Sequence, residues 1–145
     1  KVVGTLDSSI CLVCAKLDGT ISEKREDLPI FPIHMNCRCT VIGLTEYDLE
    51  EPGKRPAVFE EEKKTVHHRD GTTSTKKKIL KTKEVSAETT FKEFFERQPE
   101  KWKREYLGKT RYDLYKKDKL SISDMVENNQ IISVDELEEK VEESQ

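Results

Sequence analysis

The sequence predicts an α+β fold, and three observations support this prediction. All four cysteines lie in the first 46 residues, a strong hairpin signal follows in a lysine-rich middle, and helix-capping patterns fill the last third. We therefore expect a small cysteine-rich β knuckle (residues 1–46), a flexible basic linker or β-hairpin arm (47–88) and a C-terminal cluster of short helices (89–145). At 145 residues, the chain is one ordinary domain or two small ones.

The composition supplies little material for a hydrophobic core. Apolar residues make up 34% of the chain and charged residues 38%, with a mean hydropathy of −0.77. Part of the chain is therefore expected to be extended, disordered or dependent on a partner. The net charge of −3 is ordinary, but residues 54–83 carry +6 and residues 118–145 carry −7. This asymmetry indicates electrostatic contacts with different partners, or between the two segments.

The cysteines of the predicted knuckle form two close pairs. Cys11 and Cys14 make a CxxC motif, and Cys37 and Cys39 make a CxC motif after twenty-two intervening residues. Two such pairs joined by a loop converge on one tetrahedral metal ion, usually zinc, because thiolates are soft ligands. His34 is a further candidate, as a ligand or as a donor to a cysteine sulfur.

Local signals place these residues on regular elements. A strand over residues 2–6 and a second over 37–44 are expected, and strand geometry puts Cys37 and Cys39 on one face. A helical turn capped by residues 7–9 would hold the CxxC pair, and Gly19 after Asp18 marks a turn. The loop at residues 28–34, with two prolines, is expected to pack over the site.

Other interpretations of the cysteines stay open. Four cysteines can form two disulfides in three connectivities, which would imply an oxidising compartment, or they can be four reduced thiols in a small core. A cysteine nucleophile paired with His34 lacks an identifiable third group. A zinc deaminase is excluded, since that chemistry needs HxE before the cysteine pair and no HxE occurs.

The same stretch resembles a known family. GTLDSSICLVCAKLDG and PIHMNCRCTV are similar to the motifs of the phage head morphogenesis family, the minor head proteins similar to protein F of phage Mu. FKEFFERQPEKWKREYLGKTRYDLYKKDKLSISDMV and ISVDEL extend the likeness to the C-terminal part, leaving a divergent middle. Ile10, Phe31 and Met35 depart from the family pattern. The matching residues are Thr5, Leu6, Asp7, Cys11, Cys14, Leu17, Asp18, Gly19, Pro32, His34, Asn36, Cys37, Arg38 and Cys39.

The resemblance implies a structural virion protein rather than an enzyme. It would sit inside the capsid near the portal, after a stage in the host cytoplasm, and assist head assembly and DNA packaging or delivery. Its partners would be portal and capsid proteins. Family members carry a long helical region before this motif, and the chain opens with Lys1, so we expect a longer protein. The alternatives are a nuclease-like toxin domain of a phage-borne polymorphic toxin and a zinc-stabilised DNA-binding module.

The basic middle is a candidate contact for phage DNA. Lysines supply positive charge that is attracted to DNA phosphates. An equally good interpretation is a charged edge strand that resists aggregation. His67 and His68 precede the Asp70-Gly71 hairpin signal, so a solvated strand end is expected there rather than a catalytic cluster. The lysines proposed to meet DNA are Lys76, Lys77, Lys78, Lys81 and Lys83.

The last third carries three capping boxes. Thr90 with Glu93, Ser121 with Asp124 and Ser133 with Glu136 each predict a helix start. Pro99 should begin a second helix, Gly108 should end it, and a short helix is expected over residues 111–117. An aromatic stripe at helical spacing predicts a core: Phe91, Phe94, Phe95, Trp102 and Tyr106.

Targeting signals do not stand out in the sequence. The opening residues lack the apolar core and cleavage site of a signal peptide. No apolar run reaches the roughly 20 residues that a bilayer span needs, so no membrane partner is expected.

Overall fold

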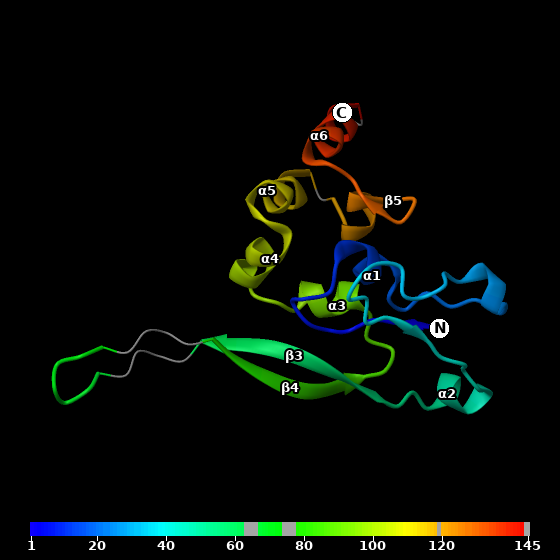
Figure 1. Ribbon diagram of the computed structural model, residues 1–145, viewed down its shortest axis with the longest axis horizontal. Coiled ribbons are helices and arrows are strands. Elements are labelled where there is room, and N and C mark those ends of the chain that lie inside the picture. Colours follow the sequence, from blue (N-terminus) through cyan, green and yellow to red (C-terminus); the bar gives the residue numbers. More distant parts are fainter. Residues whose placement is uncertain (63–66, 74–77, 119, 144–145) are drawn as a thin grey trace.

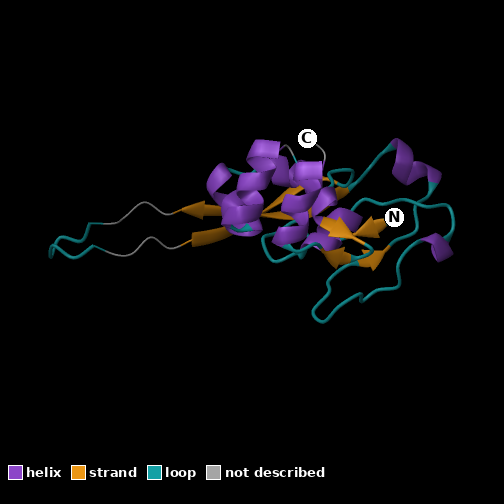
Figure 2. Cartoon of the chain, turned by 90° about the horizontal axis from the view of Figure 1, so that it is seen from above, coloured by secondary structure: helices purple, strands orange, loops and turns teal. Residues whose placement is uncertain are grey.

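A computed structural model describes residues 1–62, 67–73, 78–118 and 120–143, except the side chains of residues 62, 78 and 118. It has a body of short helices and a long two-stranded β-ribbon that projects from one side (Figure 1). Seen from above, the helices gather over one part of the ribbon (Figure 2). The predicted α+β architecture is confirmed: a Cys/His cluster lies among short N-terminal strands, and short helices follow at the C-terminus.

The N-terminal part is less regular than predicted. Strand β1 (Val2–Val3) pairs antiparallel with β2 (Thr40–Val41), and the helical turn η1 (Arg25–Asp27) lies in the loop between them. The predicted strands over 2–6 and 37–44 are therefore wrong in extent. Each strand extends only as far as its two-residue partner, since an unpaired strand does not satisfy its backbone groups.

Helix α1 (Leu12–Leu17) begins one turn later than predicted. Cys11 itself is the N-cap, and its sulfur accepts a hydrogen bond from the backbone N–H of Cys14 at 3.4 Å. The prediction that residues 7–9 cap this helix is wrong: the Asp7 carboxylate instead accepts from the backbone of Ser9. As a result, the first sulfur of the CxxC motif is fixed at the helix start and the second lies within the helix.

The middle forms a β-hairpin arm, which is one of the two predicted alternatives, rather than a flexible linker. After helix α2 (Glu46–Glu50), β3 (Lys54–Glu62) pairs antiparallel with β4 (Lys78–Ser86) over nine residue pairs. The predicted hairpin turn is confirmed, since Gly71 has φ +83° and Asp70 accepts from the backbone of Thr72. The turn lies at the free end of the ribbon (Figure 1). The backbone of Leu6 joins β3 at Val58, which attaches the ribbon base to the body.

The predicted C-terminal helices are present. They are α3 (Phe91–Glu96), α4 (Glu100–Leu107), α5 (Lys109–Asp118), the turn η2 (Ile122–Met125) and α6 (Val134–Glu143). All three capping boxes form, and Gly108 ends α4 with φ +79°. A short hairpin of β5 (Val126–Glu127) and β6 (Gln130–Ile131) is also present and was not predicted.

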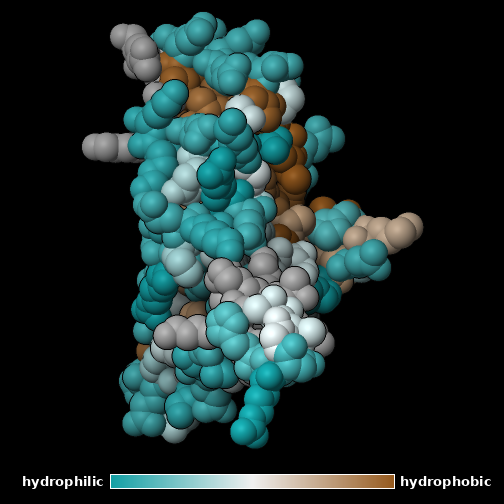
Figure 3. All heavy atoms as spheres, turned by 90° about the vertical axis from the view of Figure 1, so that its left-hand side faces the viewer, coloured by the Kyte–Doolittle hydropathy of each residue, from teal (hydrophilic) through white to brown (hydrophobic). Residues whose placement is uncertain are grey.

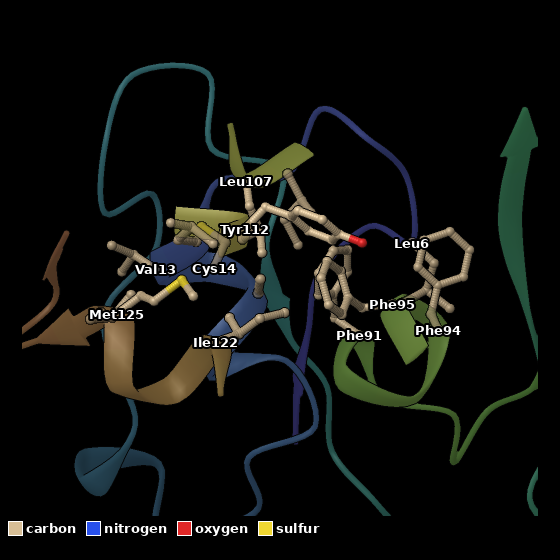
Figure 4. Close-up of a cluster of buried hydrophobic side chains, with 14 of the residues drawn as sticks. Leu6, Val13, Cys14, Phe91, Phe94, Phe95, Leu107, Tyr112, Ile122 and Met125 are labelled. Carbon is tan, nitrogen blue, oxygen red and sulfur yellow. The ribbon is translucent and has the colours of Figure 1, made fainter. Parts of the chain in front are cut away.

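The aromatic stripe forms the core, as predicted. Figure 4 shows Phe91, Phe94 and Phe95 on one side of α1, with Met125 and Ile122 on another. Phe94 also lies 5.4 Å from the ring of Phe59 on β3, so the core includes the ribbon base. Seen from the free end of the ribbon, the molecule is mainly hydrophilic with a narrow apolar band on the body (Figure 3).

A buried ion pair joins the N-terminal part, the ribbon and the helices. The Asp18 side chain is 0% exposed and that of Arg55 9%, and the two groups meet in a bidentate pair with both distances at 3.0 Å. Asp18 also accepts from the backbone N–H groups of Gly4 and Phe91, both at 2.7 Å. Arg55 donates to the carbonyls of Gly4 and Thr89. The carboxylate thus accepts four hydrogen bonds from three separate segments.

Replacing Asp18 with Asn should strongly destabilise the fold. Removing one partner leaves the guanidinium buried without its counter-charge, at a cost of about 3–5 kcal/mol in the free energy of unfolding. Urea denaturation measures the change. The control is Glu84→Gln, whose pair with Lys54 is exposed and is expected to contribute at most about 1 kcal/mol. Equal stabilities of the two variants would contradict the importance of the buried pair.

Candidate metal centre

The fold brings all five predicted site residues together. The ligand atoms of Cys11, Cys14 and His34 lie within 4.8 Å of one another, and so do those of Cys14, Cys37 and Cys39. Cys14 belongs to both groups of three and is buried on α1. The cluster could hold a metal ion such as zinc, because cysteine and histidine are the ligands that zinc prefers.

The imidazole of His34 is oriented for binding through Nε2. Its Nδ1 lies 2.7 Å from the carbonyl oxygen of Met35, which can only accept, so Nδ1 carries the proton. In the neutral ring Nε2 then has a free lone pair, and it lies 3.1 Å from Sγ of Cys11 and 3.2 Å from Sγ of Cys14. A histidine that ligates a metal commonly donates its other N–H to a carbonyl in this way.

The sulfur geometry is that of thiols and fits a metal site. All four cysteines are free, and the Sγ atoms of Cys14 and Cys37 lie 3.7 Å apart. A disulfide would need about 2.05 Å between the sulfurs. Two thiolates on one tetrahedral zinc, each about 2.3 Å from the ion, lie about 3.8 Å apart. The observed Cys14–Cys37 separation therefore excludes a disulfide between these two sulfurs and is short enough for two thiols that border one ion site.

Without an ion, burial opposes ionisation of the inner thiols. Burial, with contributions from neighbouring cysteines, raises the pKa of Cys14 far above its usual value. Burial also raises the pKa of Cys39 to about 11, although a hydrogen bond with Cys14 lowers it in part. At Cys37, burial alone would raise the pKa, but hydrogen bonds with the backbone of Cys39 and Ile33 lower it to about 7. A bound cation deprotonates coordinating thiols, so metal binding here would release protons.

An ion pair beside the cluster links the segment before the CxxC motif to the CxC motif. Arg38, between the cysteines of the CxC motif, donates to both oxygens of Asp7 at 2.7 and 3.0 Å. Burial would raise the pKa of Asp7, but the hydrogen bonds and charge of Arg38 hold it below its ordinary value. Neither Cys37 nor Cys39 lies in a strand, so the predicted strand face does not aim them. The pair with Asp7 helps to position this non-strand segment.

The other residues considered in the sequence lie elsewhere. His67 and His68 are exposed beside the Asp70-Gly71 turn, as predicted, and belong to neither group of candidate ligands. Lys81 and Lys83 are exposed on β4, where both pair with Glu61. Of the other three lysines proposed to meet DNA, residues 76 and 77 and the side chain of residue 78 lie outside the described part of the chain.

Asp7 and Asp18 have structural roles that were not predicted from the sequence. Both belong to the matched motif, yet the partner of Asp7 is 31 residues away and that of Asp18 is 37 residues away. The ion pair between Asp7 of the TLD segment and Arg38 of the CRC segment could be predicted only if the two segments were already known to be adjacent in the fold. At Asp18, the neighbouring residues in the sequence do not distinguish a buried carboxylate from the exposed aspartate of an ordinary turn.

Comparisons with known proteins do not add a family. No protein-family model matches the chain, and the comparisons with curated proteins and with solved structures found no match. Among the described residues, none of the helices is long and apolar enough to cross a membrane.

Replacing Asp7 with Asn should weaken metal binding. Arg38 would lose its charged partner and the CxC segment would be held less firmly, so we expect affinity to fall severalfold, up to about tenfold. Competition with a chromophoric chelator measures it. Asp27→Asn is the control, since that exposed carboxylate accepts a hydrogen bond from the hydroxyl of Ser22 and belongs to neither group of candidate ligands. An unchanged affinity in Asp7→Asn would show that the ion pair does not support the site.

Proposed function

We propose that this chain is a zinc-stabilised structural domain of a phage minor head protein. The observation that carries the proposal is the cluster of four thiols and one imidazole, assembled from the CxxC and HMNCRC motifs that resemble this family. The zinc has a structural role in this proposal: it cross-links α1 to the loop that contains the CxC motif. A structural site of this kind contributes folding free energy directly.

The other residues of the matched motifs also serve the fold. Asp7 forms an ion pair with Arg38, and Asp18 forms an ion pair with Arg55. Gly19 has φ +83°, and a Cβ there would lie 2.7 Å from a methyl carbon of Thr90. Each residue is thus explained by packing or by electrostatics rather than by chemistry on a substrate. This supports a structural protein over the nuclease-like toxin.

The limited hydrophobic core explains why a bound zinc would contribute to stability. The chain has only 34% apolar residues, and large apolar side chains such as Ile30 and Met35 near the cluster are 83% and 88% exposed. Small domains with little core commonly depend on a metal or disulfides. Zinc would hold the loop that bears His34 and Cys37, which has few apolar anchors of its own.

Protein purified under reducing conditions without added metal should contain about one zinc per chain. Removing it with a chelator should expose the thiols and lower the melting temperature by at least several degrees, because binding free energy becomes folding free energy. Elemental analysis, a thiol count and thermal unfolding measure these changes. Metal-free protein with four freely reactive thiols and an unchanged melting temperature would remove zinc from the proposal.

The virion role rests on the resemblance and needs its own test. Deleting the gene in its phage or prophage should reduce the yield of DNA-filled heads, counted by electron microscopy. Complementation with the wild-type gene should restore the yield, whereas Cys14→Ser should not. Full heads at the normal yield after deletion would contradict a role in head assembly or DNA packaging.

Contact with phage DNA is a further part of this proposal. The ribbon projects from the body, and Lys81 and Lys83 are exposed on it. Changing lysines 76, 77, 78, 81 and 83 to Gln should weaken DNA binding and reduce the slope of log affinity against log salt by about 0.9 for each phosphate that is no longer neutralised. Fluorescence anisotropy measures both, with Lys109→Gln/Lys117→Gln on exposed α5 positions as the control. Absent or salt-independent binding by the wild type would eliminate DNA as a partner.

A further inference from the structure

The cluster offers five donors, one more than a tetrahedral ion accepts. We propose that the ion is bound by Cys11, Cys14, His34 and Cys39, and that Cys37 remains a free thiol accessible from the surface. This inference rests on the proposed zinc site and specifies it further. It assigns an S₃N ligand set and identifies one cysteine of the CxC motif as the position open to thiol-modifying reagents.

A small cavity distinguishes the ligands from the surplus donor. A space of about 20 Å³ is lined by Cys11, Cys14, His34 and Cys39, together with neighbouring polar groups, and Cys37 does not line it. A cavity needs about 10–15 Å³ to hold one water molecule, so this one has room for a single small occupant. Four of the five donors therefore surround one space of suitable size.

Cys37 lines a surface depression and does not line the small cavity. It is partly exposed and, together with Cys39, borders a separate surface depression of about 340 Å³ beside Arg25, Phe31 and Pro32. Of these two cysteines, Cys39 is the one that also lines the small cavity. Its sulfur contacts Cys14 at 3.7 Å, which shared coordination would also produce. A separation of 3.7 Å is also an ordinary contact between two unbonded sulfurs, so it does not make Cys37 a ligand. The cavity, which Cys39 lines and Cys37 does not, assigns the ligand role to Cys39.

Alkylation of the zinc-loaded protein tests the assignment directly. Brief treatment with iodoacetamide, followed by intact-mass analysis and peptide mapping, should give one adduct, located on Cys37. Treatment after chelation should give four adducts. An adduct on Cys39 or Cys11, or complete protection of all four cysteines in the loaded protein, would overturn the assignment while leaving the zinc site in place. Protein that binds no zinc would overturn both proposals.

Two single variants provide a matched comparison. Cys37→Ser should bind zinc within about threefold of the wild type, whereas Cys39→Ser should lose more than about a hundredfold, beyond the range of outer-shell changes. Cobalt(II) substituted for zinc should show thiolate charge-transfer absorption for three sulfurs in both wild type and Cys37→Ser. A one-third fall in that absorption in Cys37→Ser would identify Cys37 as a ligand and reject the proposal.

Discussion

The buried pair of Asp18 and Arg55 is the interaction on which the rest of the structure depends. Its carboxylate receives the backbone N–H of Gly4 before the metal cluster and that of Phe91 at the start of α3. Desolvating two charges is costly, and only a full set of hydrogen bonds offsets that cost. The pair therefore fixes the relative placement of three segments more strictly than apolar contacts do, because hydrogen bonds are directional.

The metal cluster and the aromatic core are coupled through one short helix. Val13 and Cys14 are adjacent on α1 and both buried, so the helix that presents a sulfur to the cluster also packs against the helical body. Tyr106 on α4 donates to the carbonyl of Ile10, just before the first cysteine. An ion that orders the loop around His34 would thus add to a core that already positions the CxxC motif.

Features encoded locally could be predicted from the sequence, and those that depend on distant partners could not. Thr90 with Glu93 and Ser133 with Glu136 identified helix starts because a capping box is complete within four residues. The cluster of candidate ligands could be predicted because two closely spaced pairs of cysteines joined by a loop can fold back onto one place. The strand after Cys39 was predicted too long because its length is set by β1, nearly forty residues earlier. The turn at Asn128 and Asn129, both with positive φ, was a local signal that was overlooked.

The contacts of Asp18 also bear on how this fold can be divided. Cut out alone, residues 1–46 would keep every thiol of the cluster but would leave the Asp18 carboxylate without the guanidinium and the Phe91 amide that solvate it. The aromatic helices would likewise lose the apolar face of α1. The segment that contains the cysteine motifs is therefore not expected to fold by itself, and recombination could not transfer it alone between proteins. Its transfer requires the first strand of the ribbon and the start of α3 to move with it.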